Sequence, residues 1–348
     1  MYKNRLIAVF TVLVLLFQSS LVSCQSTEGT TPVVNPKEAL PDSGSTVIKV
    51  GNTSVPVDTA LYNKHIQHLI NGDSSGKWPV KDVYPLAGAI LPFNRIIAFY
   101  GNLYSKQMGI LGELPPKQML EKLKGEVKKW QAADTTINVI PALHYIAVTA
   151  QQYGGKNNTY RLRMPFHQID SVINMAKQID ALVFLDIQVA LSTLQKEVPE
   201  LEKYLMMPNV HFGIDPEFSM KGGQAPGKAV GSFDANDINY VSGYLASLVK
   251  KYNLPPKIFV IHRFTQAMVK NTQDIKLRPE VQIVMHMDGW GHPARKFNTY
   301  RQFIYKEPVQ FTGFKIFYKN DLKEANSRIL QPEDLLKLKP QPVYIQYQ

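Results

Sequence analysis

Two acidic residues at the end of one apolar segment are the residues of this sequence best suited to chemistry. Residues 210–218 read Val-His-Phe-Gly-Ile-Asp-Pro-Glu-Phe and are predicted to form a buried strand. Because alternate side chains of a strand point to opposite faces, Gly213, Asp215 and Glu217 share one face, which we expect to line a pocket. Two like charges placed in this way push their pKa values apart, so that one group stays protonated beside an ionised partner.

A protonated carboxyl group beside a carboxylate is the equipment for cleaving a glycosidic bond. Glu217 has the longer side chain and is predicted to donate a proton to the leaving oxygen. Asp215 lies deeper and is expected to hold a reacting group or to stabilise charge at the anomeric centre. Asp288 is predicted to act on the same centre from a neighbouring strand. These three acids are the predicted catalytic residues.

The strands that must position these acids alternate with helices along residues 94–348. Strands are predicted at 95–101, 137–146, 181–188, 210–218, 257–264, 281–288, 313–318 and 342–347. Helices are predicted at 116–131, 165–179, 192–206, 295–305 and 332–338, with a further one after the N-cap residue Asp234. This alternation predicts a (β/α)8 barrel of the α/β class. The alternative is an open doubly wound sheet, which expects a glycine-rich turn where Tyr100-Gly101-Asn102 stands.

Polar side chains gather where the predicted strands end, and in a (β/α)8 barrel those ends form the active-site face. The predicted substrate-binding residues are Tyr100, His144, Asp186, Gln188, His262, His286, Trp290, Lys315 and Gln346. Lys315 is also a candidate counter-ion for the acids. Tyr100, Phe264, Trp290 and Tyr347 are expected to offer faces for stacking on sugar rings. For single residues, the alternatives are a helix-capping role for Asp186 and a core position for His144 and His262.

The N-terminus predicts export and lipid anchoring. Residues 1–23 carry basic residues and then an apolar run, as in a signal peptide, and Leu-Val-Ser-Cys resembles the lipobox of bacterial lipoproteins. Cys24, the only cysteine, is the predicted lipidation site; the alternative is an ordinary signal peptide. Residues 24–57 are predicted to form a flexible tether, and 58–93 an extension that packs on the barrel. We therefore expect a protein of the bacterial cell envelope, anchored to a membrane through lipid.

Charge and composition narrow the partners. The formal net charge of +11 is spread along the chain as single Lys and Arg residues, without a basic stripe. This distribution argues against nucleic-acid binding and suits an anionic envelope surface. We expect a polysaccharide or peptidoglycan-like glycan as the partner, and neither a cofactor nor a resident metal.

Two segments resemble a known family. Gly213-Ile214-Asp215-Pro216-Glu217 resembles the end of the strand-four motif of the chitinase-like family 18 glycosidases, Asp-x-Glu. Met285-His286-Met287-Asp288 resembles the Met-x-Tyr-Asp motif of that family, with methionine in place of its tyrosine. The resemblance implies that Glu217 is the general acid, that Asp215 orients a substrate N-acetyl group, and that Asp288 assists. Family 25 muramidases also carry Asp-x-Glu on a barrel strand.

Two other function classes remain open on the sequence alone. Glu217, His262 and His286 follow successive strands, as ligands do in metal-dependent hydrolases with barrel folds, but the remaining ligand positions of that family hold other residues. The second class is a surface lipoprotein that binds glycans without cutting them. Replacing Glu217 by Gln separates an enzyme from a binder, and metal analysis tests the metal-dependent alternative.

Overall fold

The computed structural model describes residues 56–348. Cys24, the predicted signal peptide and all but the last residues of the predicted tether therefore lie outside the described residues. Within the described part, no helix combines the length and the apolar character that a membrane span requires.

Eight parallel strands close into a barrel. The strands are β1 (Asn94–Gly101), β2 (Asn138–Ala150), β4 (Leu182–Ile187), β5 (Val210–Ile214), β7 (Lys257–Arg263), β9 (Val281–Met287), β10 (Phe311–Ile316) and β11 (Tyr344–Tyr347). Closure is seen at β1, where Ile96 lies opposite Ile140 of β2 on one side and opposite Tyr344 of β11 on the other. An open sheet would leave β1 or another strand with a free edge. The predicted (β/α)8 barrel is thus confirmed, and the doubly wound alternative is wrong.

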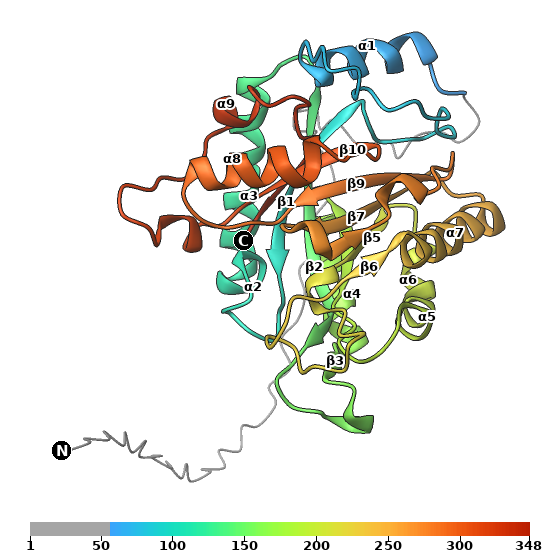
Figure 1. The fold of residues 1–348 in the computed structure, drawn as a ribbon, viewed down its shortest axis with the longest axis vertical. Coiled ribbons are helices and arrows are strands. Elements are labelled where there is room, and N and C mark those ends of the chain that lie inside the picture. The colour runs from blue at the N-terminus through green and yellow to red at the C-terminus, as the bar shows by residue number, and fades with distance from the viewer. Residues whose placement is uncertain (1–55) are drawn as a thin grey trace, which may run out of the picture. The chain divides into compact units, whose positions relative to one another are not determined.

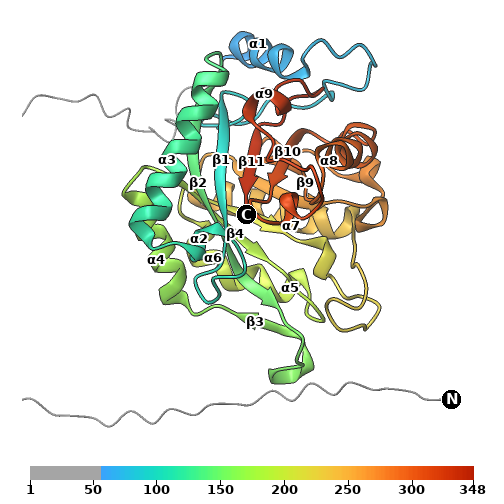
Figure 2. The same cartoon turned by 90° about the vertical axis from the view of Figure 1, so that its left-hand side faces the viewer.

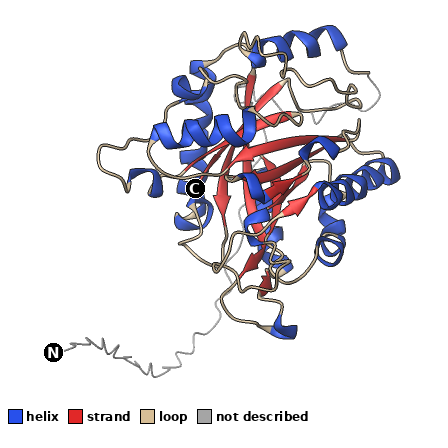
Figure 3. Ribbon diagram, viewed as in Figure 1, coloured by secondary structure: helices blue, strands red, loops and turns tan. Residues whose placement is uncertain are grey.

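Helices surround the strands on the outside of the barrel (Figures 1 and 3). The longer α-helices are α1 (Thr59–Ile70), α3 (Pro116–Ala133), α4 (Phe166–Lys177), α7 (Ala235–Tyr252) and α8 (Pro293–Tyr300). The short ones are α2 (Ile110–Glu113), α5 (Leu194–Glu197), α6 (Glu202–Leu205) and α9 (Pro332–Leu335). Asp234 caps α7 as predicted, because its carboxylate accepts from the backbone N–H groups of Asn236 and Asp237.

The two faces of each barrel strand pack against different partners. Val210, Phe212 and Ile214 of β5 point outward into the large apolar core beneath the helices. A smaller apolar cluster, which includes Ile96, Phe184 and Val260, fills the N-terminal half of the barrel interior. Polar residues replace apolar ones in the C-terminal half, which is where the strands end. The barrel interior is therefore apolar in its N-terminal half and polar in its C-terminal half.

The segment before β1 lies against the N-terminal end of the barrel, at the top of Figure 2. Leu69, Ile90 and Leu91 belong to the apolar cluster of the barrel interior. The side chain of Gln282 on β9 holds this segment, since it accepts from the backbone N–H of Leu91 at 3.1 Å and donates to its carbonyl at 2.6 Å. This segment therefore covers the N-terminal end of the barrel.

Several predicted elements differ from the structure in length. The strand predicted at 210–218 ends at Ile214, because Pro216 starts a 3-10 turn, η3 (Pro216–Phe218), that Asp215 caps. The helix predicted at 192–206 is divided into α5, the 3-10 turn η2 (Pro199–Leu201) and α6, again at a proline. The helix predicted at 295–305 is α8 followed by a π-helical turn (Arg301–Tyr305).

Three short strands were not predicted. These strands are β3 (Arg161–Arg163), β6 (Phe233–Asp234) and β8 (Val269–Lys270). β3 pairs antiparallel with the end of β2, so that the β2–β3 connection forms a hairpin past the end of the barrel (Figure 2). Such short pairings carry too few residues for an alternating pattern to reveal them.

Candidate active site

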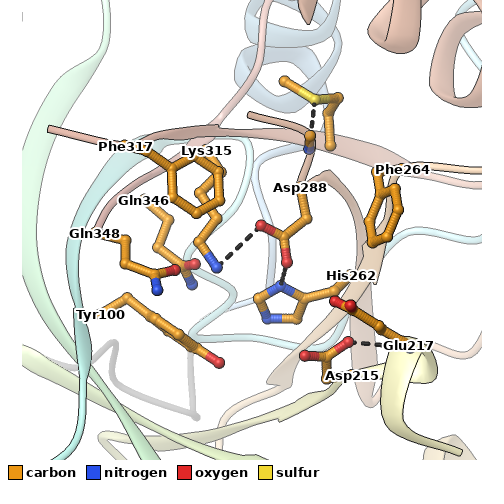
Figure 4. A network of polar contacts seen from close by, with 12 residues as sticks. Tyr100, Asp215, Glu217, His262, Phe264, Asp288, Lys315, Phe317, Gln346 and Gln348 are labelled. Atoms are coloured by element: carbon orange, nitrogen blue, oxygen red, sulfur yellow. Dashed lines mark hydrogen bonds and ion pairs between the residues drawn. The ribbon is translucent and has the colours of Figure 1, made fainter. Parts of the chain in front are cut away.

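A cavity of about 640 Å³ opens at the C-terminal ends of the barrel strands. Its lining includes the predicted site residues Tyr100, Gln188, Asp215, Glu217, Asp288, Trp290 and Lys315. Its apolar wall includes Met108, Phe218, Phe264 and Phe317. The acids thus converge on one space together with aromatic and cationic side chains, although they come from different strands (Figure 4).

Asp215 and Glu217 reach the cavity through a turn rather than along a strand face. The Asp215 carboxylate accepts from the backbone N–H of Glu217 at 3.1 Å, which closes the turn and sends the two side chains to one side. Asp215 is only 3% exposed and also accepts from the Gln188 side chain at 3.3 Å. Glu217 is half-buried and lies further out. The predicted shared face thus results from the proline turn, whereas the strand geometry assumed for it was wrong.

Burial raises the pKa values of both acids. The pKa of Asp215 rises to about 8, because its carboxylate is removed from water and faces the negative charges of Glu217 and Asp288. Burial, and then the charge of Asp288, also raise the pKa of Glu217. Among the described residues, no Lys, Arg or His nitrogen forms an ion pair with either acid. Both carboxyl groups therefore keep their protons to a higher pH than exposed acids do.

Asp288 has the opposite environment. Its carboxylate lies 2.9 Å from Lys315 Nζ through Oδ1 and 2.7 Å from His262 Nδ1 through Oδ2. Burial raises the pKa of Asp288, but the charges of Lys315 and His262 outweigh burial and hold it far below the ordinary value. The ammonium group of Lys315 also lies 3.9 Å from the centre of the Tyr100 ring. The pKa values are therefore pushed apart between Asp288 and the other two acids, and not between Asp215 and Glu217 as the sequence predicted.

A second polar layer lies beneath the cavity. Its residues are His144, Asp186, His262, His286 and Gln346, all fully buried, and none of them lines the cavity. The sequence predicted substrate contacts for all of them because their strand positions match those of the lining residues. The structure instead places them below the floor, where Tyr100 covers the layer and donates to Asp186 Oδ2 at 3.0 Å.

The buried layer contains a group with the composition of a metal site. Within residues 56–348, only His144, Asp186 and His262 bring potential ligand atoms within 4.8 Å of one another. The set Glu217, His262 and His286, considered from the sequence, is not such a group. In the first set, His144 Nδ1 lies 2.5 Å from the Tyr344 hydroxyl and 3.2 Å from the Gln346 side-chain nitrogen, so this ring nitrogen already has partners within the layer. Asp186 accepts from the Tyr100 hydroxyl, and His262 Nδ1 lies 2.7 Å from Asp288 Oδ2. These contacts fit a network of polar side chains within the layer.

The aromatic predictions divide between the cavity and the core. Phe264 and Trp290 line the cavity, and Trp290 is 45% exposed. Tyr347 does not: it is buried on the outside of the barrel, where its hydroxyl accepts from Trp130 Nε1 at 2.9 Å. The stacking role predicted for Tyr347 is therefore wrong, because its position in β11 points outward.

Sequence reasoning missed part of the cavity wall. Phe218 is the last residue of the turn η3, and Phe317 directly follows β10, so a search of the residues after each strand would have found both. Met108 lies in the connection between β1 and α2, far from any strand end, and no local pattern marks it.

Comparisons with known proteins return only distant likenesses. No protein-family model matches the sequence, and no curated protein matches it. The structure is similar to the cellulase Cel5C_n, at 13% identity and a TM-score of 0.35 over 64% of this chain and 64% of that chain, less than two thirds of the cellulase. A GH5-4 broad-specificity endoglucanase from Clostridium longisporum matches at 12% identity and a TM-score of 0.34, over 64% of this chain and 75% of that chain.

A protein of another kind also matches. HPPK-DHPS from Plasmodium falciparum is similar at 9% identity and a TM-score of 0.33, over 83% of this chain and 52% of that chain. The barrel itself is shown by the pairing of its strands.

Proposed function

We propose that this protein is a glycoside hydrolase in which Glu217 donates a proton and Asp288 supplies the opposing negative charge. One observation carries the proposal: Asp288 is paired with Lys315 and His262, whereas Glu217 shares its cavity without a cationic partner. The two environments push the pKa values apart, and such a pair of carboxyl groups is what cleavage of a glycosidic bond requires.

The proposed reaction uses each carboxyl group once. Glu217 protonates the glycosidic oxygen while the bond between that oxygen and the anomeric carbon breaks. The Asp288 carboxylate stabilises the positive charge that develops on the sugar ring, and Lys315 keeps Asp288 anionic. Water then adds to the anomeric carbon, and its released proton returns to Glu217, so that the enzyme is restored.

Asp215 fits a binding role beside these two acids. Its backbone-held carboxyl group is protonated at neutral pH and therefore offers an O–H donor to a substrate carbonyl. This donor, together with the resemblance of residues 213–217 to family 18 glycosidases, supports an N-acetylhexosamine-containing substrate whose acetamido group Asp215 orients. A peptidoglycan-like or environmental polysaccharide carries such groups.

The walls of the cavity suit a sugar ring. Met108, Phe218, Phe264, Trp290 and Phe317 supply apolar faces above the polar floor. Sugars present C–H groups on one face and hydroxyl groups at their edge, which matches aromatic walls and a charged base.

We further propose that the enzyme works in the bacterial cell envelope, held by lipid on Cys24. The lipobox-like sequence before Cys24 and the scattered positive charge support this location. Incorporation of labelled palmitate into the native chain, and its loss on Cys24→Ala, is the expected result; label retained by the variant would refute the anchor.

A release assay tests the catalytic proposal. The full chain in detergent is incubated with peptidoglycan and with β-linked N-acetylhexosamine and neutral glycans, and new reducing ends are measured. We expect products from the native protein and a loss of roughly a hundredfold or more for Glu217→Gln. Glu333→Gln is the matched control, because Glu333 is exposed on α9 and away from the cavity.

Two other results would change the assignment. Equal release by the native chain and Glu217→Gln would remove Glu217 as the acid. Binding of these glycans by both proteins without release by either would favour the glycan-binding lipoprotein, which the sequence also permits.

A further inference from the structure

The buried layer beneath the cavity contains an imidazole ring with a carboxylate at each nitrogen. His262 Nδ1 lies 2.7 Å from Asp288 Oδ2, and His262 Nε2 lies 3.5 Å from Asp186 Oδ2. A neutral imidazole carries one N–H, so one ring nitrogen would then turn a lone pair toward a carboxylate. The doubly protonated imidazolium instead turns an N–H toward each carboxylate, with a hydrogen bond at Nδ1 and an ion pair without a hydrogen bond at Nε2. The geometry therefore assigns a positive charge to a fully buried histidine.

The positive charge of His262 would in turn stabilise the buried carboxylate of Asp186. Its carboxylate is fully buried, and its only hydrogen bond among the described residues comes from the Tyr100 hydroxyl to Oδ2. A buried carboxylate with so few donors is costly unless a cation lies close by. His144 Nε2 lies 3.7 Å from Oδ1, but burial lowers the pKa of His144 to about 4, so that ring is neutral. His262 is the remaining source of positive charge at ion-pair distance.

The charges around His262 support the same assignment. The titratable and charged groups that face it are Tyr100 from β1, His144 from β2, Asp186 from β4, Asp215 and Glu217 after β5, His286 from β9, Asp288 after β9 and Lys315 from β10. Burial lowers the pKa of His262, and Lys315 opposes its charge, but Asp186 and Asp288 outweigh both and raise it. Burial keeps His286 neutral, since it lowers the pKa of that ring well below its ordinary value.

We propose that Asp186 is a positioning residue that holds His262 as an imidazolium, and that this cation, with Lys315, keeps Asp288 ionised and aimed into the cavity. Asp186, His262 and Asp288 then form one buried series of ion pairs. The loss of the Asp186 charge is expected to raise the pKa of Asp288 through His262. The catalytic consequence rests on the proposed glycosidase function, whereas the charge of His262 does not.

Nitrogen NMR of the histidine rings tests the charge directly. The full chain has 8 histidines, and His262→Gln identifies the His262 signals by their loss. At about pH 7 we expect both His262 nitrogens to show imidazolium shifts, with His144 and His286 neutral. Asp186→Asn should lower the His262 titration midpoint by roughly one pH unit or more. A neutral His262 at about pH 7, or a midpoint that Asp186→Asn leaves in place, would overturn the proposal.

Two further variants make the result specific. Asp134→Asn is the matched control, because Asp134 is also buried and ion-paired, with Arg95 at the opposite end of the barrel, and it should leave His262 unchanged. Asp288→Asn removes the other carboxylate and keeps Asp186. If Asp186 holds the cation, His262 stays charged in this variant at about pH 6; a neutral ring there would refute the role of Asp186 even if Asp186→Asn fails to fold.

Activity then separates a positioning role from a general loss of structure. For Asp186→Asn we expect kcat for glycan release to fall roughly ten- to a hundredfold with KM nearly unchanged, because the reacting group is displaced while the cavity wall is intact. A variant with native kcat would exclude the catalytic consequence. If the native protein releases no glycan at all, the proposed function fails, and the NMR result still decides the charge of His262.

Discussion

Gly213 faces the buried carboxylate of Asp186 so closely that a Cβ atom at Gly213 would lie 2.7 Å from Asp186 Oδ1. The same atom would lie 2.8 Å from His144 Nε2. Adjacent barrel strands thus bring a backbone and two polar side chains together where a methyl group has no room. The glycine that precedes the acidic turn is therefore required by the buried layer, and not by the cavity above it.

Gly213→Ala should consequently disturb the buried layer. The added methyl group must displace Asp186 or His144, and overpacking of this kind costs roughly 1–3 kcal/mol of the free energy of unfolding. Gly125→Ala is the control, because nothing lies within 4 Å of a Cβ at Gly125 in helix α3. It should be neutral or stabilising by up to about 1 kcal/mol, since alanine favours a helix over glycine. Urea unfolding measures both, and equal stability of the two variants would contradict the packing argument.

The sequence predicted the barrel because its signal is repeated. Alternating apolar strands and helices recur along the chain, and the polar residues after the strands then fall on one face. The strand pattern could not, however, distinguish residues that line the cavity from residues of the buried layer beneath it. Tyr100 and His144 lie side by side in register on β1 and β2, yet one lines the cavity and the other is buried beneath it. That difference depends on the stagger of the strands around the barrel, and the sequence of one strand does not reveal this stagger.

The acidic turn shows the second limit. Asp215 and Glu217 were predicted on one face by strand alternation, and they do share the cavity, but Pro216 ends the strand and the turn places them there. Lys315, predicted as a counter-ion for the acids, does pair with Asp288, whereas the pairing of His262 with Asp288 was not predicted. Opposite pKa shifts of three acids in one cavity are a property of the assembled barrel.

Trp290 should contribute to binding and little to stability. Its ring lies at the cavity wall and is 45% exposed, so Trp290→Ala removes a stacking face without opening the core. We expect the affinity for a glycan oligomer to fall by about tenfold, as loss of about 1–1.5 kcal/mol of aromatic contact implies. Leu322→Ala is the control, because Leu322 is similarly exposed and does not line the cavity. Calorimetric titration with equal affinities for both variants would remove Trp290 from the binding site.

Asp215 should make the stability of the protein depend on pH. Its pKa in the folded state is raised to about 8, so the stabilisation it gives is fully present below the unfolded-state pKa near 4 and is lost as the pH rises through about 8. Asparagine cannot ionise, so Asp215→Asn should be more stable than the native chain at about pH 8 by roughly 2–4 kcal/mol. The difference should vanish near pH 4.

Asp134 provides a control of opposite sign for this measurement. Although burial raises the pKa of Asp134, its bonds with Arg95 and His68 outweigh burial and lower it to about 2. Its stabilisation is therefore present above the unfolded-state pKa and is lost as the pH falls toward 2. Asp134→Asn should be less stable than the native chain at about pH 8. Urea unfolding at several pH values measures both differences, and a pH-independent effect of Asp215→Asn would contradict the raised pKa.

Glycan release should have an alkaline limit set by the protonated acids. Burial raises the pKa of Glu217, so the proton donor persists to a higher pH than an exposed glutamic acid would and is lost above its pKa. Asp215 loses its O–H donor as the pH rises through its pKa of about 8. The acid side should be flat down to about pH 4, because Asp288 stays ionised there. Initial rates across pH measure the profile. A rate that rises steadily above about pH 8 would show that no protonated carboxyl group takes part.

Lys315→Met tests the charge that keeps Asp288 anionic. Methionine retains much of the lysine stem but removes the ammonium group that lies 2.9 Å from Asp288 Oδ1, so the pKa of Asp288 should rise and an acid limb should enter the pH profile of release. Removing one partner of a buried ion pair also lowers the free energy of unfolding by roughly 3–5 kcal/mol, and partial protonation of Asp288 makes this loss smaller. Lys319→Met is the matched control, because Lys319 pairs with Glu113 at the surface and should change stability by less than about 1 kcal/mol. If a folded Lys315→Met protein shows no acid limb, His262 alone suffices to hold the negative charge of Asp288. His262 is the remaining cation at that carboxylate.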